Sequence, residues 1–228
     1  MTQRKAPLRL DDRARPRKPN EPKRRRLLLI DEADKEAALF FVRWLKAPNR
    51  IGAVAPSSKL LARAMAREVA GAGPGPIVEL GGGTGSVTRA LLEAGIAPER
   101  LIVVERDRKL HGLLAERFPA LKVLHGDAGH LRRLLAPLGI KEAAAVVSSL
   151  PLISMPRHTR TRIIAESFAL LGQGRPFVQF TYGPVSPIAR REMGLAGKLA
   201  ARVWANLPPA SVWRYERIAG RERTRKIA

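Results

Sequence analysis

The chain has 228 residues, no cysteine, and 42 lysines and arginines against 20 acidic residues, which gives a formal net charge of +22. The lack of cysteine excludes disulfides, zinc-thiolate sites and thiol nucleophiles, and no apolar run approaches the ~20 residues that span a bilayer. This charge favours a polyanionic partner, either nucleic acid or an anionic membrane, although solvated charge alone gives the same composition.

Residues 1–30 are rich in arginine, lysine and proline and carry almost no periodic apolar residues. Such a segment cannot bury enough surface to offset the entropy lost on ordering, so we predict a disordered basic arm. Its short apolar stretch 27–30 is followed at once by Asp31 and Glu32, which is not the pattern of a secretory signal. The arm is either an inert solvated tail or a tether to an anionic surface, where each basic residue contributes about 1 kcal/mol.

An amphipathic helix is predicted within residues 31–50, because apolar residues recur there at helical spacing and basic residues border them. The apolar stripe comprises Ala37, Phe40, Phe41, Trp44 and Leu45, and its basic neighbours are Lys35, Arg43 and Lys46. Large aromatic side chains with basic flanks suit a helix that lies in a membrane interface. The pattern by itself, however, favours an ordinary helix packed on a domain core.

From residue 51 to residue 228, strand and helix signals alternate between glycine and proline breakers. The expected strands are 77–80, 101–105, 122–125, 143–148 and 176–182, and the expected helices are 59–69, 86–94, 108–117, 130–138 and 156–171. A further helix over about 193–206 and a last strand over about 211–218 complete the series. This alternation predicts one α/β domain with a parallel sheet and helices on both faces.

The strongest motif is the segment 79–86, Glu-Leu-Gly-Gly-Gly-Thr-Gly-Ser, which leaves an expected strand and enters an expected helix. Glycines there allow a sharp turn close to a ligand, and the helix N-terminus offers free N–H groups. The dinucleotide fingerprint requires glycine at position 86, where this chain has serine. The motif resembles instead the first motif of class I S-adenosylmethionine methyltransferases. That resemblance implies a methionine and ribose site shaped by Gly81, Gly83 and Gly85, with Glu79 helping to bind the amino acid portion.

Acidic residues lie at the end of, or shortly after, the next two expected strands. Glu105 ends strand 101–105, roughly 20 residues after the glycines, where a carboxylate accepts both ribose hydroxyl protons in dinucleotide-binding folds. The alternative for Glu105 is a surface acid in a charged loop. Asp127 follows strand 122–125, and resemblance to class I methyltransferases implies that it binds the adenine amine. Its alternative is a helix cap.

The segment 148–152, Ser-Ser-Leu-Pro-Leu, ends the fourth expected strand, where acceptor chemistry occurs in this fold. Adenine-specific methyltransferases of ribosomal RNA carry Asn-x-Pro and an aromatic there, which hold the target amine and stack on the flipped base. Ser149 replaces that asparagine and Leu152 replaces that aromatic, which argues against a base as acceptor. Ser149 and Tyr182, both at strand ends, are the candidate catalytic residues on the acceptor side, although Tyr182 is equally well explained by packing.

From about residue 38 onward the chain resembles the bacterial phosphatidylethanolamine N-methyltransferases of the rRNA-dimethylase-like type. The matching stretches are 41–48, 51–58, 79–85, 148–151, 179–183, 206–210 and 212–215. Two departures are Gly82, where the family usually has proline, and the long basic arm. The resemblance implies a Rossmann-like class I methyltransferase fold with a mostly parallel seven-stranded sheet. It also implies that the helix within 31–50 binds an anionic membrane through Phe40, Phe41 and Trp44.

The expected function is N-methylation of a phospholipid head-group amine, phosphatidylethanolamine towards phosphatidylcholine, with S-adenosyl-L-methionine as cofactor. The expected location is the cytoplasm, with peripheral binding to the inner leaflet of the plasma membrane. The alternative is an rRNA adenine N-methyltransferase, which explains the basic charge equally well but does not explain Leu152. The four histidines lack metal-ligand spacing, so no metal is expected.

Overall fold

The computed structural model describes residues 56–190, 192–206 and 209–218. The basic arm 1–30 and the helix expected within 31–50, with Phe40, Phe41 and Trp44, lie outside the described residues. None of the helices in the described ranges is both long enough and apolar enough to cross a bilayer.

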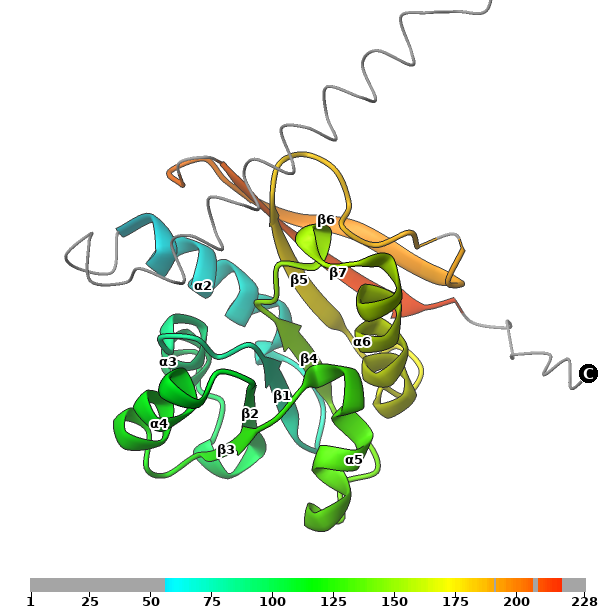
Figure 1. The fold of residues 1–228 in the computed structure, drawn as a ribbon. Helices are drawn as coiled ribbons and strands as arrows, with labels where there is room; N and C mark the ends of the chain where they lie inside the picture. Colours follow the sequence, from blue (N-terminus) through cyan, green and yellow to red (C-terminus); the bar gives the residue numbers. More distant parts are fainter. Residues whose placement is uncertain (1–55, 191, 207–208, 219–228) are drawn as a thin grey trace, which may run out of the picture.

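Seven strands of the described residues form one sheet in the order β3-β2-β1-β4-β5-β7-β6 (Figure 1). The strands are β1 Ile77–Leu80, β2 Leu101–Glu105, β3 Lys122–His125, β4 Ala145–Ser148, β5 Phe177–Tyr182, β6 Leu195–Val203 and β7 Ala210–Arg217. Strands β1 to β5 pair in parallel, whereas β7 runs antiparallel to both β5 and β6. The prediction of a mostly parallel, seven-stranded α/β sheet is therefore confirmed. The carboxyl ends of β1 to β5 form one edge of the sheet, called the carboxyl edge below.

Helices cover both faces of the sheet, as expected for parallel strands that are buried on both sides (Figure 1). They are α2 Pro56–Ala70, α3 Ser86–Glu93, α4 Arg108–Arg117, α5 Leu131–Leu135 and α6 Arg157–Leu170, with short 3₁₀ turns η2 Pro98–Arg100, η3 Ala128–His130, η4 Ala136–Leu138 and η5 Leu152–Ser154. Side chains alternate along each strand, so Ile77 and Val147 face α2, α3 and α4, while Val78 and Val146 face α5 and α6.

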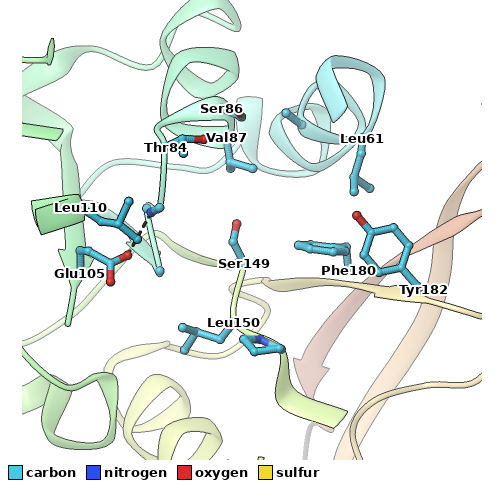
Figure 2. Close-up of a pocket in the computed structure, with 15 residues that line it drawn as sticks. Leu61, Thr84, Ser86, Val87, Glu105, Leu110, Ser149, Leu150, Phe180 and Tyr182 are labelled. Carbon is cyan, nitrogen blue, oxygen red and sulfur yellow. Dashed lines mark hydrogen bonds between the residues drawn. The ribbon is translucent and has the colours of Figure 1, made fainter. Parts of the chain in front are cut away.

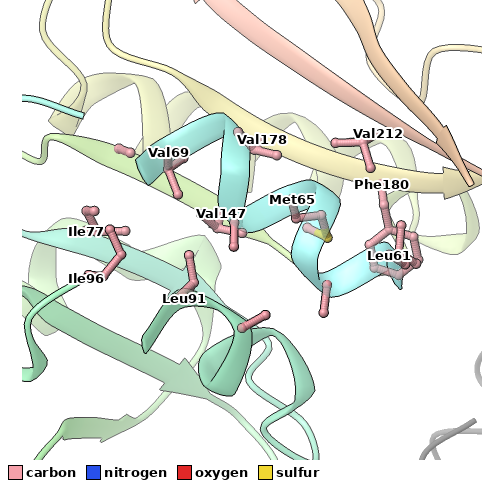
Figure 3. Packing of buried hydrophobic residues seen from close by; sticks show 14 of the residues in the cluster. Leu61, Met65, Val69, Ile77, Leu91, Ile96, Val147, Val178, Phe180 and Val212 are labelled. Carbon is pink, nitrogen blue, oxygen red and sulfur yellow. The ribbon is translucent and has the colours of Figure 1, made fainter. Parts of the chain in front are cut away.

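Helix α2 is the element of the first face that connects the core to the site. Its residues Leu61, Met65 and Val69 are buried at helical spacing and pack against Val147 and Val178 of the sheet (Figure 3). The helix starts at Pro56, earlier than the expected 59–69. Helix α2 contacts β5, β6 and β7 as well as α3, so it connects the antiparallel strands to the helix that follows β1.

The expected helix over 193–206 is wrong, because this segment forms β6 and pairs with β7. Its alanines, leucines and basic residues favour a helix locally, but pairing with β7 satisfies the backbone and overrides that preference. A Cβ atom on Gly197 would lie 2.6 Å from the ring of Tyr215, so glycine at this position leaves room for the ring to pack over β6. The expected helix 130–138 is also interrupted. Pro137 cannot donate a helical hydrogen bond, so α5 ends at Leu135 and the next residues form the 3₁₀ turn η4.

Candidate active site at the carboxyl edge

The glycine-rich turn begins directly after β1 at the carboxyl edge. Gly81, Gly83 and Gly85 have φ values of 74°, 56° and 83°, a left-handed conformation that favours glycine. A Cβ atom on Gly81 would lie only 2.7 Å from Cδ2 of Leu150, so the turn packs closely against the segment 148–152, called the acceptor segment below. Gly85 precedes α3 without a side-chain cap, which leaves backbone N–H groups at the start of the helix available to a ligand.

Glu105 is the last residue of β2, and its side chain is hydrogen-bonded to the glycine-rich turn. Its side chain is buried, its Oε2 accepts a hydrogen bond from the Gly83 N–H at 3.0 Å, and its Oε1 accepts one from the Asp107 N–H at 2.9 Å. Each carboxylate oxygen can accept more than one hydrogen bond, so the carboxylate retains acceptor capacity toward the cavity that it lines. This geometry suits the predicted contact with two ribose hydroxyls, which stays a prediction.

Glu79 occupies a different position from the other predicted residues. Its side chain is fully buried, its Oε2 accepts a hydrogen bond from the Thr88 hydroxyl at 2.7 Å, and its Oε1 has no partner among the described residues. Burial raises the pKa of Glu79 to about 8, with a further contribution from the negative charge of Glu105. The carboxyl group lines neither cavity described below. Its hydrogen bond links β1 to the first turn of α3, and its predicted contact with the methionine portion stays a prediction.

Replacing Glu79 with glutamine is expected to flatten the dependence of stability on pH. Because burial raises the pKa from 4.5 to about 8, the folded protein retains a proton that the unfolded chain releases, so stability falls as pH rises from about 4.5 to about 8. Glutamine keeps the shape and an acceptor for Thr88 but does not titrate. Thermal melts of both proteins at intervals across this range measure the difference.

Equally steep pH dependence in the glutamine variant would assign the titration to another group. The same variant also tests the predicted role of Glu79 in cofactor binding. Calorimetric titration with S-adenosylmethionine above about pH 8, where the Glu79 carboxyl is ionised, separates the two roles, because glutamine removes a charge that would bind the cationic methionine portion, whereas replacement of a purely structural carboxyl leaves the affinity unchanged.

A cavity opens between the turn, the acceptor segment, α2 and the end of β5 (Figure 2). Five of the predicted site residues line it: Gly81, Gly83, Glu105, Ser149 and Tyr182. An adjoining cavity extends toward β3 and includes Asp127, and the two cavities share Gly81, Glu105, Leu110, Leu150 and Pro151. The structure thus brings all predicted site residues except Glu79 and Gly85 to one continuous opening.

Asp127 lies in the second cavity and also caps a turn. Its Oδ1 accepts a hydrogen bond from the Gly129 N–H at 2.7 Å at the start of η3, and its Oδ2 lies 3.7 Å from the Arg106 guanidinium. The capping alternative considered from the sequence is therefore observed. Asp127 also lines the second cavity, so the predicted contact with the adenine amine remains a prediction alongside the cap.

Ser149 presents a polar atom to the first cavity. Its backbone N–H donates to the Leu80 carbonyl at 2.9 Å, which fixes the acceptor segment beside β1. Its hydroxyl is buried, has no partner among the described residues, and points into the space between the glycine-rich turn and the rings of Phe180 and Tyr182 (Figure 2). A buried hydroxyl without a partner is costly, and a bound amine would satisfy it.

Gln179 anchors the acceptor segment, a role that the sequence did not reveal. Its side chain is buried in β5, and its Nε2 donates to the Leu150 carbonyl at 2.9 Å and to the Phe180 carbonyl at 2.7 Å. The Oε1 atom has no partner among the described residues. One sequence signal could have indicated this role: Gln179 is the single amide in the mostly apolar strand Phe177–Tyr182. A buried amide side chain needs hydrogen-bond partners.

Tyr182 forms the wall of the cavity farthest from the turn, together with Phe180. The two rings meet edge to face, with centroids 5.6 Å apart and an interplanar angle of 83°. Burial raises the pKa of Tyr182 to about 12, partly offset by a hydrogen bond from Asn206. The phenol is therefore neutral at physiological pH and serves as a hydrogen-bonding group rather than as a base. Asn206 lies in the matching stretch 206–210, but its contact with Tyr182 is visible only in the fold.

These groups fit an adenosyl sulfonium cofactor. A buried carboxylate with spare acceptor capacity faces the opening, a helix N-terminus lies beside it, and aromatic rings line the far wall, where they favour a cation. Among the residues that the structure describes, no cluster of His, Asp or Glu is arranged to hold a metal ion. The parallel sheet and this turn at its carboxyl edge define a class I methyltransferase.

Comparison with known proteins identifies the family. No protein-family model matches the chain. An ornithine lipid N-methyltransferase of Singulisphaera acidiphila is 33% identical over 153 residues, which cover 66% of this chain and 80% of that enzyme. The chain therefore belongs to the family of this lipid N-methyltransferase, within the S-adenosylmethionine-dependent methyltransferases. Its methyl donor is accordingly S-adenosylmethionine.

Two further similarities concern parts of the molecule. Ribosomal RNA small subunit methyltransferase A of Burkholderia lata is 46% identical over 79 residues, which cover 33% of this chain but only 28% of that protein. The O-methyltransferase from Bacillus cereus, solved in complex with SAH, superimposes with a TM-score of 0.57 at 10% identity and covers 80% of this chain and 91% of that one. The structural likeness supports the fold, and the ribosomal RNA enzyme matches only a minor part of its own length.

Proposed function

We propose that the protein N-methylates the amine of a phospholipid head group, phosphatidylethanolamine, at an anionic membrane surface. The observation that carries the proposal is the Ser149 hydroxyl, which is directed into the cavity at the position where adenine methyltransferases carry asparagine. A single hydroxyl suits a small alkyl amine, whereas an adenine needs a larger set of polar partners. Similarity to a lipid N-methyltransferase over 80% of its length supports a lipid acceptor.

The residues of the cavity prepare the acceptor amine. Bound S-adenosylmethionine supplies an electrophilic methyl group, so the protein chiefly has to align the amine and keep it neutral. The aliphatic walls formed by Leu61, Ala62 and Val87 disfavour the charged ammonium and so lower its pKa. Ser149 accepts a hydrogen bond from the amine, and the Tyr182 hydroxyl, which pairs with Asn206, has capacity for one more. Neither Ser149 nor Tyr182 is a base at neutral pH, so the proton that the ammonium loses leaves to solvent.

Two structural findings concern the rRNA alternative. Leu152 is only 1% exposed and packs into the core, so the lack of an aromatic at position 152 does not decide between a base and a lipid amine. Phe180 and Tyr182 also place aromatic rings in the cavity from β5, so the missing aromatic at position 152 does not by itself exclude a base. The serine at position 149 and the lipid methyltransferase relative favour the lipid.

Radiolabelled S-adenosylmethionine tests the acceptor directly. The protein is incubated with anionic vesicles that contain phosphatidylethanolamine, with vesicles that contain ornithine lipid, and with ribosomal RNA. We expect label in phosphatidylethanolamine and none in RNA. Label in ornithine lipid alone would retain the lipid class and change the acceptor, whereas label in RNA adenine and not in lipid would overturn the proposal.

In this proposal the arm 1–30 and the helix within 31–50 attach the catalytic domain 51–228 to the inner leaflet of the plasma membrane. The double substitution Phe40→Ala with Trp44→Ala is expected to release the protein from anionic vesicles and leave cofactor binding intact. Burial of each large apolar side chain is worth roughly 1.5–3 kcal/mol. Vesicle sedimentation measures the effect, with Val42→Ala, outside the stripe, as the matched control. Parent-like sedimentation of the double variant would assign the helix to the core.

A further inference from the structure

Trp204 is the most exposed large apolar side chain in the described residues, at 70%. Trp213, in the adjacent strand β7, is only 8% exposed. An indole ring in water forgoes the stabilisation that burial gives to a large aromatic side chain. Such exposure therefore points to an interaction partner at this position.

Trp204 lies at the same edge of the sheet as the active-site cavity. It directly follows Val203, the last residue of β6, and β6 runs in the same direction as β5 because both are antiparallel to β7. Val203 pairs with Ala210, and Ala210 pairs with Tyr182 on its other side. Val203 is therefore two strand spacings, about 10 Å, from the position of Tyr182 across the sheet, and Trp204 is the next residue. Figure 1 shows the end of β6 and the start of β7 on the same side of the molecule as the start of α2.

Further apolar and basic side chains share this edge. Leu60 is 46% exposed and precedes Leu61, which lines the cavity, and Val185 is 40% exposed and follows the end of β5. The guanidinium of Arg202 lies 5.6 Å from the centroid of the Trp204 ring, and Lys59 is exposed beside Leu60. We call Lys59, Leu60, Val185, Arg202 and Trp204 the edge patch.

We propose that the edge patch docks on an anionic lipid bilayer, with Trp204 inserted into the interface, so that the mouth of the cavity faces the lipid. Indole rings favour the level of the lipid head groups, where the ring is partly buried and its N–H stays hydrated. Arg202, Lys59 and the net charge of +22 complement anionic head groups. A membrane partner also explains why the patch lies at the same edge of the sheet as a cavity that must receive a lipid head group.

The inference rests on the proposed function and adds orientation to it. A helix within 31–50 would attach the protein to a membrane without determining which side faces the lipid. A second contact at the carboxyl edge fixes the rotation of the domain and brings the cavity to the head groups. The loss of either contact has different consequences, because only the edge patch aligns the site.

Tryptophan fluorescence in a Trp44→Phe background tests the contact, because Trp204 and Trp213 then remain as the two indoles of the chain. Vesicles of equal parts phosphatidylglycerol and phosphatidylcholine are added, with or without spin-labelled lipid. We expect a blue shift of the emission and quenching by labels near the head groups. The matched control, Trp44→Phe with Trp204→Phe, retains only the buried Trp213 and is expected to show neither change. Unchanged quenching of Trp204 by aqueous iodide in protein that sediments with the vesicles would overturn the inference, as would failure of the parent to bind vesicles.

Kinetics provide a second readout that separates this inference from the proposed function. Trp204→Ala is expected to raise the KM for lipid in vesicles about tenfold, the effect of losing a partly buried indole, with no change for the same lipid in detergent micelles. The control is Ile218→Ala, because Ile218 is 43% exposed but follows β7 at the opposite edge. A Trp204→Ala variant that matches the parent on vesicles overturns the docking alone. Absence of lipid methylation even in micelles overturns the proposed function.

Discussion

Replacing Glu105 with alanine is expected to weaken S-adenosylmethionine binding at least tenfold. Hydrogen bonds to a charged acceptor contribute about 1.5–3 kcal/mol each, and the predicted contacts are with two ribose hydroxyls. The substitution also removes the acceptor for the Gly83 and Asp107 N–H groups, so the turn itself loses support. Isothermal titration calorimetry gives the affinity, and a thermal melt without cofactor shows whether the variant is folded.

Two variants sharpen the Glu105 experiment. Glu105→Gln preserves size but turns one acceptor into a donor that faces a backbone N–H group, so it is also expected to bind the cofactor weakly. Glu99→Ala removes an exposed acidic residue in η2, just before the opposite end of β2, and is expected to leave the affinity unchanged. Parent-like affinity in folded Glu105→Ala would remove this carboxylate from the cofactor site.

Replacing Gln179 with leucine is expected to lower kcat about a hundredfold while the affinity for S-adenosylmethionine changes little. The leucine fills a similar volume but cannot donate to the Leu150 carbonyl, so the acceptor segment is no longer tied to β5. A displacement of about 1 Å between reacting groups costs on the order of a hundredfold in rate. Because Gln179 acts through the acceptor segment, it is a positioning residue, and the split between kcat and cofactor affinity is the diagnostic readout.

Gln173→Leu is the matched control for this experiment, because Gln173 is an exposed glutamine that precedes β5, at the end of the strand opposite the carboxyl edge. It is expected to behave as the parent. A folded Gln179→Leu variant with unchanged kcat would show that other contacts, such as the Ser149 N–H to Leu80 carbonyl bond, suffice to hold the segment.

The accuracy of the sequence-based predictions follows from how local each signal is. Strand β2, helix α4 and strand β3 were predicted residue for residue. The apolar run of β2 is a local signal, and the structure shows that Asp107 caps α4 by accepting hydrogen bonds from the N–H groups of Lys109 and Leu110. The strand β6 was missed because its identity depends on pairing with β7, and nothing within 195–203 encodes that partner.

The residues of the site also fall into those that a local sequence signal predicts and those whose role depends on distant contacts. The glycine-rich turn and the acid at the end of β2 each belong to a contiguous stretch of sequence, and the fold places them together because parallel strands end at one edge of the sheet. Gln179 and Asn206 act through contacts with a loop and a ring that lie 29 and 24 residues away along the chain. Their residue types alone predict only that a buried amide finds partners, and the identity of those partners requires the folded chain.

The close approach between Gly81 and Leu150 restricts how this enzyme can diverge. A larger residue at position 81 would collide with Leu150 and would also be held at an unfavourable φ of 74°. A smaller residue at position 150 would remove the collision but not the unfavourable φ. Drift toward a new acceptor is therefore expected to leave the turn intact. We expect it to proceed through the opposite wall, where Leu61, Phe180 and Tyr182 can change size without disturbing the backbone that holds the cofactor.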